Sequence, residues 1–144
     1  INWLIDSEDL QKNFYIDEKI NLMRLMLHPQ GLKPFVSNWE EIVSHLIKRV
    51  YREAIADNNN KQPRQLYQEL MTYPDVPQLW KLSHTQTWQI PLLTVKFFKD
   101  GLNLNFFSAI ATLGTPQDIM LQELRIETLF PADEITQKNL QKLN

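Results

Sequence analysis

The spacing of apolar residues changes once along the chain, and this change constrains the fold more than any other feature. In the first part of the chain, apolar residues recur every three to four positions, as in a helix packed on one side. After residue 90 they alternate, beginning with Leu93, Val95 and Phe97, as in a half-buried strand. The sequence therefore predicts helices followed by an antiparallel sheet, forming one α+β domain over residues 1–144.

Cap and breaker residues predict where the helices lie. Asp17 is a suitable N-cap for an almost wholly apolar helix over residues 20–27. Ser37-x-x-Glu40 has the pattern of a capping box and predicts a long helix after it. Pro63 is placed to open a third helix, and a short helical turn is expected around residues 79–80.

Asp100-Gly101 is a strong signal for a two-residue hairpin turn between two alternating segments. A third strand is expected over residues 123–130, with one buried and one solvated face, followed by a terminal helix to about Leu143. The hairpin predicts three facing pairs, which are Phe97 with Leu104, Val95 with Phe106, and Leu93 with Ser108.

Composition excludes several classes of function. The net charge is −2 and no segment gathers Lys and Arg, so we expect any DNA contact to come from outside this chain. The chain has no cysteine, which excludes disulfides and thiolate sites and fits the cytoplasm. No apolar run approaches the roughly 18 residues that a membrane helix requires. We therefore expect a cytoplasmic protein without membrane association.

The histidines offer no metal site, since His28, His45 and His84 lack any zinc-binding spacing. Glu41 and His45 share one helix face, and we interpret them as an exposed polar pair rather than half of a metal site.

No catalytic constellation is found. Asp75, Ser83 and His84 could be combined into a triad, but no nucleophile elbow accompanies them. Glu123 and Glu127 would project from one strand face roughly 13 Å apart, too far for shared acid–base chemistry, and Arg125 between them would bridge its neighbours or a dimer partner. We expect no catalytic residue, no metal and no cofactor, and hence no enzyme.

The remaining feature is an excess of apolar side chains, including four Trp and seven Phe. The apolar helix at 20–27 must be covered, and a sheet can cover it. Met23 and Met26 belong either to a solid core or to an adaptable cavity between that helix and the sheet. The residues alone leave both interpretations open.

Two sequence blocks resemble the MmyB-like ligand-binding domain. One covers residues 21–32 together with Asn38-Trp39-Glu40-Glu41, and the other covers residues 113–134. Tyr73-Pro74 and Val76-Pro77 follow in the same order as in that family. The resemblance spans roughly residues 1–140. It implies a PAS-like fold, in which helices pack on an antiparallel sheet, and a sensor role in bacterial transcription regulators with an upstream XRE-type helix-turn-helix.

Some members of that family hold a fatty-acid-like molecule between helices and sheet, so the resemblance favours a cavity here. The family has a strand and a helix-turn-helix before the point that matches residue 1, and we expect both to be absent from this chain. The pattern predicts the ligand contacts Leu22, Met23, Arg24, Met26, Trp39, Leu46, Val95, Leu104 and Phe106.

Arg24 either meets a ligand carboxylate or extends to solvent. The alternative function is a dimerisation or interaction module with a solid core, in which the sheet face or the terminal helix pairs two copies. Either way, we expect a homodimer whose DNA contacts come only through the upstream helix-turn-helix.

Overall fold

The computed structural model describes residues 4–5, 14–16, 19–56, 59–85, 93–112 and 125–143. Helices and an antiparallel sheet are both present, so the predicted α+β class is confirmed. The chain divides into two compact units, residues 1–89 and residues 90–144, and the prediction of a single domain over the whole chain stays a prediction.

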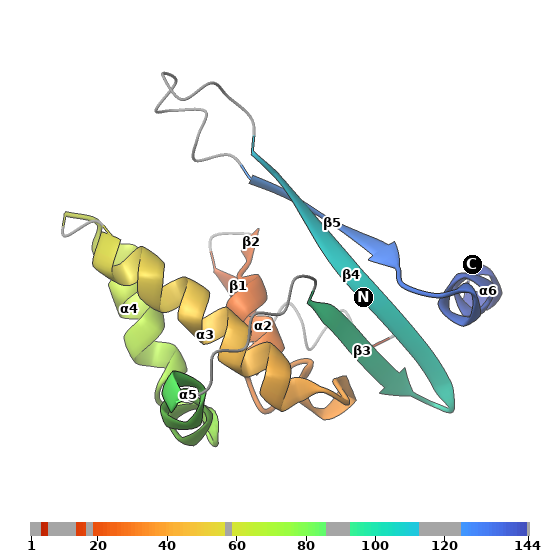
Figure 1. The fold of residues 1–144 in the computed structure, drawn as a ribbon, viewed down its shortest axis with the longest axis horizontal. Coiled ribbons are helices and arrows are strands. Elements are labelled where there is room, and N and C mark those ends of the chain that lie inside the picture. Colours follow the sequence, from red (N-terminus) through yellow and green to blue (C-terminus); the bar gives the residue numbers. More distant parts are fainter. Residues whose placement is uncertain are drawn as a thin grey trace. The chain divides into compact units, whose positions relative to one another are not determined.

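The first unit is helical apart from a small hairpin near its start, and α3 packs against both α4 and α5 within it (Figure 1). Its elements in chain order are β1 (Tyr15–Ile16), β2 (Lys19–Ile20), α2 (Leu22–Leu27), the 3-10 helix η1 (Lys33–Phe35), α3 (Trp39–Ala56), α4 (Lys61–Leu70) and α5 (Val76–Thr85).

The helix predicted over residues 20–27 begins later than expected. Its N-cap is Asn21, whose side-chain oxygen accepts a hydrogen bond from Arg24 N at 3.1 Å. The predicted start was wrong because Ile20 belongs to β2 and pairs with Tyr15. Asp17, the predicted cap, lies outside the described residues.

Three helix boundaries also differ from the predictions. The long helix begins at Trp39, so Asn38 rather than Ser37 precedes its first residue. Helix α4 begins two residues before Pro63, because Asn60 caps it by accepting a hydrogen bond from Gln62 N at 3.1 Å. The turn expected around residues 79–80 is the ten-residue helix α5.

A close backbone approach joins α2 to the segment that follows it. Leu32 N donates a hydrogen bond to Leu25 O at 2.8 Å, and a Cβ at the intervening Gly31 would collide with the same carbonyl oxygen. Glycine is therefore required at this position. The apolar core of this unit lies around this contact and along α3. It includes Phe14, Leu25, Leu27, Leu32, Ile42, Val43, Ile47, Val50, Leu70 and Val76.

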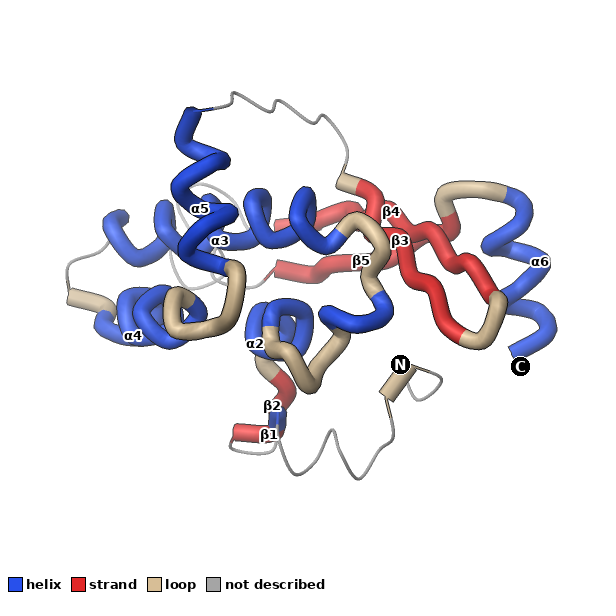
Figure 2. Tube along the Cα trace, turned by 90° about the horizontal axis from the view of Figure 1, so that it is seen from below, coloured by secondary structure: helices blue, strands red, loops and turns tan. Residues whose placement is uncertain are grey.

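The second unit is a three-stranded antiparallel sheet with one helix, in the strand order β3-β4-β5. Asp100 and Gly101 have positive φ values of 52° and 78°, as the predicted hairpin turn requires. Figure 2 shows α6 against the sheet near this hairpin end. The elements are β3 (Thr94–Lys99), β4 (Leu102–Thr112), β5 (Arg125–Pro131) and α6 (Glu134–Leu143).

The predicted hairpin register is confirmed for Phe97 with Leu104 and for Val95 with Phe106. The third predicted pair, Leu93 with Ser108, is not part of the ladder, which starts at Thr94. Because side chains alternate, this register gives the sheet two distinct faces. The Phe97 face carries Val95, Phe97, Leu104 and Phe106, and the α6 face carries Asn103, Asn105, Phe107 and Phe130.

The predicted buried face of the third strand was wrong. Phe130 is paired with Phe107 on the α6 face but stays 42% exposed, and Thr128 is also exposed. Leu129, on the opposite side, is 55% exposed. In the described part of the sheet β5 is an edge strand, so its side chains have neighbours on one strand rather than on two. This leaves Leu129 on one face of the sheet and Phe130 on the other both exposed. Leu124 lies outside the described residues.

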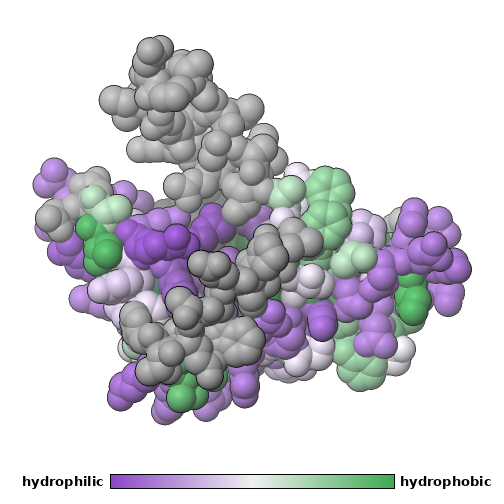
Figure 3. Space-filling view, viewed as in Figure 1, coloured by the Kyte–Doolittle hydropathy of each residue, from purple (hydrophilic) through white to green (hydrophobic). Residues whose placement is uncertain are grey.

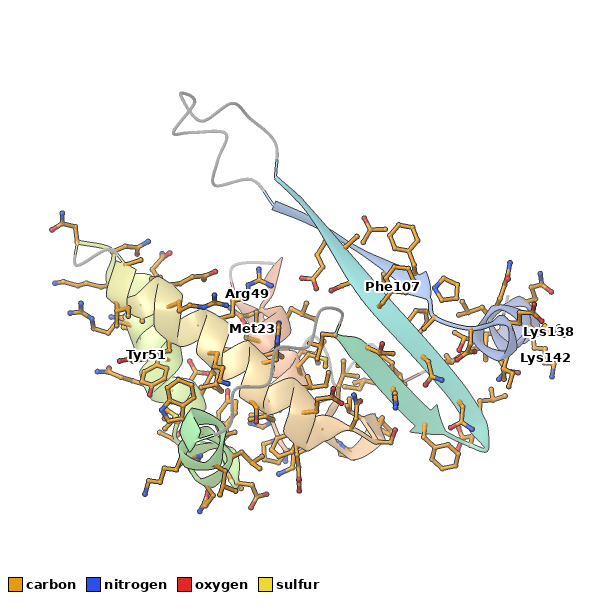
Figure 4. The ribbon with its side chains drawn as sticks, viewed as in Figure 1. Met23, Arg49, Tyr51, Phe107, Lys138 and Lys142 are labelled. Carbon is orange, nitrogen blue, oxygen red and sulfur yellow. The ribbon has the colours of Figure 1, made fainter. Side chains whose placement is uncertain are left out.

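Polar contacts attach α6 to β4. Asp133 caps the helix, accepting from Thr136 N and from Asn105 Nδ2, both at 2.7 Å. Asn105 N donates to Thr136 Oγ1 at 2.9 Å, and Asn139 Nδ2 donates to Asn103 O at 3.1 Å. Thr136 is fully buried by this arrangement. Helix α6 thus turns polar side chains toward the sheet, and Lys138 and Lys142 point away from it (Figure 4).

Candidate functional site

Four of the predicted ligand contacts come from α2, and they differ in exposure. Leu22 is 44% exposed, Met23 and Arg24 are half-buried, and Met26 is buried. Met23 is labelled in Figure 4. The first turn of α2 thus keeps accessible apolar surface, and its last turn is part of the core.

Trp39, the fifth predicted contact, is fixed inside the helical unit. Its Nε1 donates a hydrogen bond to Met26 O at 3.2 Å, which satisfies a carbonyl at the C-terminal end of α2. Lys33 Nζ lies 4.0 Å from the centre of the Trp39 ring and 2.7 Å from Asp75 Oδ2. Trp39 is 8% exposed, so it holds α2, η1 and α3 together. Leu46, the sixth predicted contact, lies on α3 and is half-buried.

Arg24, the third predicted contact, has a protein partner that the sequence did not predict. Its Nε and Nη2 donate to Glu69 Oε1 and Oε2, each at 2.7 Å, in a bidentate pair between α2 and α4. Tyr73 Oη donates to Glu69 Oε1 at 2.8 Å. Arg24 therefore does not extend freely to solvent, because its guanidinium is paired with Glu69. Contact with a ligand carboxylate stays a prediction. Residue spacing carries no signal for this contact, because 45 residues separate the two partners.

The pair shifts the proton affinities of its members. The hydrogen bonds from Arg24 hold the pKa of the Glu69 carboxyl below its usual range, against the opposing effect of burial. Burial first, and then the hydrogen bond to Glu69, raise the pKa of Tyr73 well above 10. The pKa of Arg24 is also raised, chiefly by its hydrogen bond to Glu69. The network is thus fixed as Arg⁺, Glu⁻ and neutral Tyr.

His28 lies in an aromatic row beside this network. Its ring packs edge-on against Phe14, with centroids 5.3 Å apart, and against Tyr73, with centroids 5.0 Å apart. Its Nδ1 accepts a hydrogen bond from Gln30 N at 3.1 Å. The histidine therefore packs at the end of α2 and has no nucleophile beside it in these contacts.

A second aromatic cluster joins α3, α4 and α5. Tyr51 (Figure 4) lies 5.4 Å from Tyr67 and 5.2 Å from Trp80, measured between ring centroids. Tyr67 and Trp80 are 6.2 Å apart. At these distances the rings pack directly on one another, so they stabilise the helical unit.

The other residues considered for chemistry are not assembled into a site in the described part of the chain. Glu41 accepts a hydrogen bond from Asn38 Nδ2 at 2.9 Å, and Glu41 and His45 are both exposed. Asp75 is paired with Lys33, and the side chains of Ser83 and His84 lie outside the description. Among the described residues, no group of three His, Asp or Glu could hold a metal ion.

The remaining predicted contacts lie in the second unit, on the Phe97 face. Leu104 is 3% exposed, and Val95 and Phe106 are half-buried. Phe97, which was not among the predicted contacts, is buried and packs against Phe106 at a centroid distance of 6.2 Å. The register therefore gathers the three predicted residues on one apolar surface, together with Phe97.

Comparison with known proteins identifies the family. Residues 12–143 match the family model of the MmyB-like transcription regulator ligand binding domain. No curated protein and no solved structure matches the chain. No helix in the described part of the chain is long and apolar enough to cross a membrane. The match covers nearly the whole sequence, and it agrees with the resemblance carried by residues 21–32 and 113–134. The chain therefore belongs to the family of MmyB-like transcription regulator ligand binding domains.

Proposed function

We propose that this domain binds an apolar small molecule of the fatty-acid type, and that the ligand changes how an attached helix-turn-helix module binds DNA. The family consists of ligand-binding domains of transcription regulators, which supports a regulatory rather than a catalytic role. The single observation that carries the apolar character of the ligand is the Phe97 face of the sheet, where large apolar side chains are aligned across β3 and β4.

The Phe97 face would contact the ligand through its less buried members. Phe97 and Leu104 are buried and form a firm base, whereas Val95 and Phe106 keep accessible apolar surface. Covering such surface stabilises a complex by about 25 cal/mol for each Å² removed from water. An alkyl chain suits these side chains because none of them offers a hydrogen bond that a polar ligand would need.

In the helical unit, we propose Leu22 and Met23 as the direct contacts of α2 and Leu46 as that of α3. All three keep accessible surface, and a methionine side chain adapts to ligands of different shape. Met26 and Trp39 are buried and joined by a hydrogen bond, so their role in binding would be to hold α2 in place.

Arg24 keeps its proposed role only through donors that Glu69 does not use. The ion pair takes Nε and one Nη2 donor, and a guanidinium has five N–H donors in all. A ligand carboxylate would therefore approach the Nη1 side and share the guanidinium with Glu69. In this proposal Arg24 contributes orientation of the head group, and the apolar chain contributes most of the affinity.

The regulatory step requires two states of the protein. A ligand shifts an equilibrium only if it binds one state more tightly than the other. We propose that the ligand-bound domain favours one arrangement of a cytoplasmic, bacterial XRE-type regulator on its operator. DNA contacts would then come from the helix-turn-helix and not from this chain, whose net charge is −2.

Titration with a fluorescent fatty acid tests the proposal. Phe106→Ala shortens an accessible side chain of the Phe97 face, and Phe98→Ala makes the same change on the other side of β3, where Phe98 is 50% exposed. We expect saturable binding to the wild type, a loss of about tenfold for Phe106→Ala, which equals about 1.4 kcal/mol, and little change for Phe98→Ala. Absence of saturable binding to the folded wild type, or equal losses in the two variants, would overturn it.

A further inference from the structure

Three hydrogen-bond donors of the helical unit converge on one carboxylate. Arg24 Nε and Nη2 on α2 donate to the two oxygens of Glu69 at 2.7 Å, and Tyr73 Oη, after α4, donates to Oε1 at 2.8 Å. A guanidinium edge that forms two parallel hydrogen bonds matches the geometry of any carboxylate, whether it belongs to the protein or to a ligand. These donors therefore form a carboxylate-binding site, and Glu69 fills it.

Contacts outside the ion pair hold these donors in place. Asn21 caps α2 by accepting a hydrogen bond from Arg24 N at 3.1 Å, which fixes the backbone from which the guanidinium extends. The ring of Tyr73 packs edge-on against that of His28, with centroids 5.0 Å apart. Neither contact involves the Glu69 carboxylate, so the donors do not depend on it for their positions.

Glu69 is the member of the network that can leave. Its side chain is 37% accessible, compared with 23% for Arg24. It lies in the last turn of α4, where the helix dipole disfavours a negative charge. Its backbone is held independently, because Thr72 donates to Glu69 O from N at 2.9 Å and from Oγ1 at 2.6 Å. The carboxylate can therefore turn to water while the end of α4 stays folded.

The residues before Arg24 add apolar surface to the same turn of α2. Leu22 is 44% exposed, and Met23 is half-buried. A fatty acid joins a carboxylate to an alkyl chain, so its two parts match the two kinds of side chain on this turn. Covering the apolar surface is favourable for such a ligand, and the short side chain of Glu69 gains nothing comparable.

We propose that the Glu69 carboxylate is an internal competitor of the ligand carboxylate, and that ligand binding releases it from Arg24. The ligand first meets the Nη1 side of the guanidinium, and the two negative charges then repel each other across one shared cation. Glu69 turns to water, and Tyr73 Oη donates to the ligand instead. The inference rests on the proposed function, since it concerns the same ligand and the same arginine.

Release of Glu69 gives ligand binding a structural consequence. Without ligand, the ion pair joins α2 to α4. With a carboxylate ligand bound, that link is broken, so the two states differ in how firmly α2 is attached. Coupling of this kind is reciprocal, and Glu69 must therefore weaken the binding of a carboxylate as much as the carboxylate weakens the hold on Glu69. A ligand without a carboxylate leaves the pair intact.

Calorimetric titration with a fatty acid, and with the alcohol of the same chain length, tests the proposal. We expect Glu69→Gln to bind the acid about fivefold more tightly than the wild type does, a typical coupling between linked sites. The alcohol should bind equally well to both proteins, because it has no charge to compete with Glu69. Arg24→Met should lose the preference for the acid over the alcohol.

Glu53→Gln is the matched control, because it removes the same charge from another ion pair of the helical unit. Glu53 Oε1 lies 3.6 Å from Arg49 Nε, four residues earlier on α3. Figure 4 labels Arg49, and Figure 3, seen from the same side, shows mainly hydrophilic residues over this part of α3. We expect this variant to bind the acid like the wild type. An equal gain for Glu53→Gln and Glu69→Gln would be an effect of net charge alone and would overturn the proposal.

NMR titration of the Glu69 carboxyl in the wild type needs no variant. Arg24, Tyr73 and His28 lower the pKa of this carboxyl, and the hydrogen bonds from Arg24 have the largest effect. Losing Arg24 and gaining a second carboxylate nearby both raise the pKa of Glu69. We therefore expect the bound fatty acid to raise it and the bound alcohol to leave it low. An unchanged pKa with the fatty acid bound would contradict the release of Glu69.

The outcomes separate this inference from the proposed function. If the folded wild type binds neither the acid nor the alcohol, the proposed function fails, and the competition fails with it. If the wild type binds both and Glu69→Gln gains no affinity for the acid, only the competition is refuted.

Discussion

Arg24 on α2 and Glu69 at the end of α4 form a bidentate ion pair across 45 residues of sequence, with both N···O distances at 2.7 Å. Tyr73 donates a further hydrogen bond to the same carboxylate. The pair is partly exposed, with 23% of the Arg24 side chain and 37% of the Glu69 side chain accessible. It ties the helix that carries four predicted ligand contacts to the α3–α4 pair.

Breaking this pair should destabilise the chain moderately. Arg24→Met keeps the aliphatic length but leaves the Glu69 carboxylate without its charged partner. Glu69→Gln keeps the shape of the side chain but leaves the Arg24 guanidinium without its charged partner. We expect each to lower the free energy of unfolding by about 1–2 kcal/mol after allowance for solvent screening. Urea unfolding of both variants and of the double variant measures the coupling. A coupling near zero would show that the pair contributes nothing.

The same pair should make stability fall in acid. The pKa of the Glu69 carboxyl is lowered in the folded state from its ordinary value of 4.5, so between the folded-state and the unfolded-state pKa the unfolded chain binds more protons. The contribution of the ionised Glu69 carboxylate to the free energy of unfolding is therefore present above about pH 4.5, and it is lost as the pH falls through the folded-state pKa. Comparing urea midpoints from pH 7 to pH 3, we expect a shallower acid decline for Glu69→Gln. Parallel declines in the two proteins would contradict this assignment.

Much of the fold follows from local sequence signals. Asp100-Gly101 supplies positive φ values at both turn positions, and this local choice sets the confirmed register of Val95 with Phe106. Likewise, the apolar spacing after Trp39 predicted α3, although its first residue differed by one. Hairpin turns and long periodic helices are determined mainly by near neighbours, so they can be read from a single sequence.

The errors have a common cause in contacts that the apolar spacing within one segment does not report. Ile20 joined a strand instead of a helix because Tyr15 pairs with it. Phe130 stayed exposed because β5 is an edge strand in the described sheet, which alternation alone does not reveal. The bond between Arg24 and Glu69 gives no periodic signal at all. The nine predicted ligand contacts fall in both units, and their role in binding stays a prediction.

Gly31 should tolerate no side chain. A Cβ there would collide with Leu25 O, so Gly31→Ala must move the backbone at the end of α2, and we expect a loss of roughly 2 kcal/mol or more.

Gly101→Ala offers a contrast, because that site has open space but a φ of 78°. There we expect a loss near 1 kcal/mol that Gly101→Asn largely restores, since Asn tolerates positive φ. Thermal unfolding distinguishes the two mechanisms. A stability for Gly31→Ala equal to that of the wild type would contradict the predicted collision.

The docking of α6 should depend on the Thr136 hydroxyl. Thr136→Val keeps the shape of this buried side chain but removes the acceptor for Asn105 N. We expect a loss of about 1–3 kcal/mol, the usual cost of an unsatisfied buried donor. Thr136→Ser should keep the hydrogen bond, and Ile135→Thr, at a position 65% exposed, should change little. Hydrogen exchange at Asn105 reports the result, and unchanged protection in Thr136→Val would contradict it.

Mass spectrometry of the purified domain shows whether it carries an apolar ligand, as we propose. The protein is weighed under native conditions, and the molecules extracted by organic solvent are then identified. We predict a stoichiometric fatty acid or similar lipid in the wild type, with a reduced amount in Phe106→Ala. A well-folded wild type that is reproducibly empty, and that takes up no added fatty acid, would show that the domain does not bind a ligand of this type.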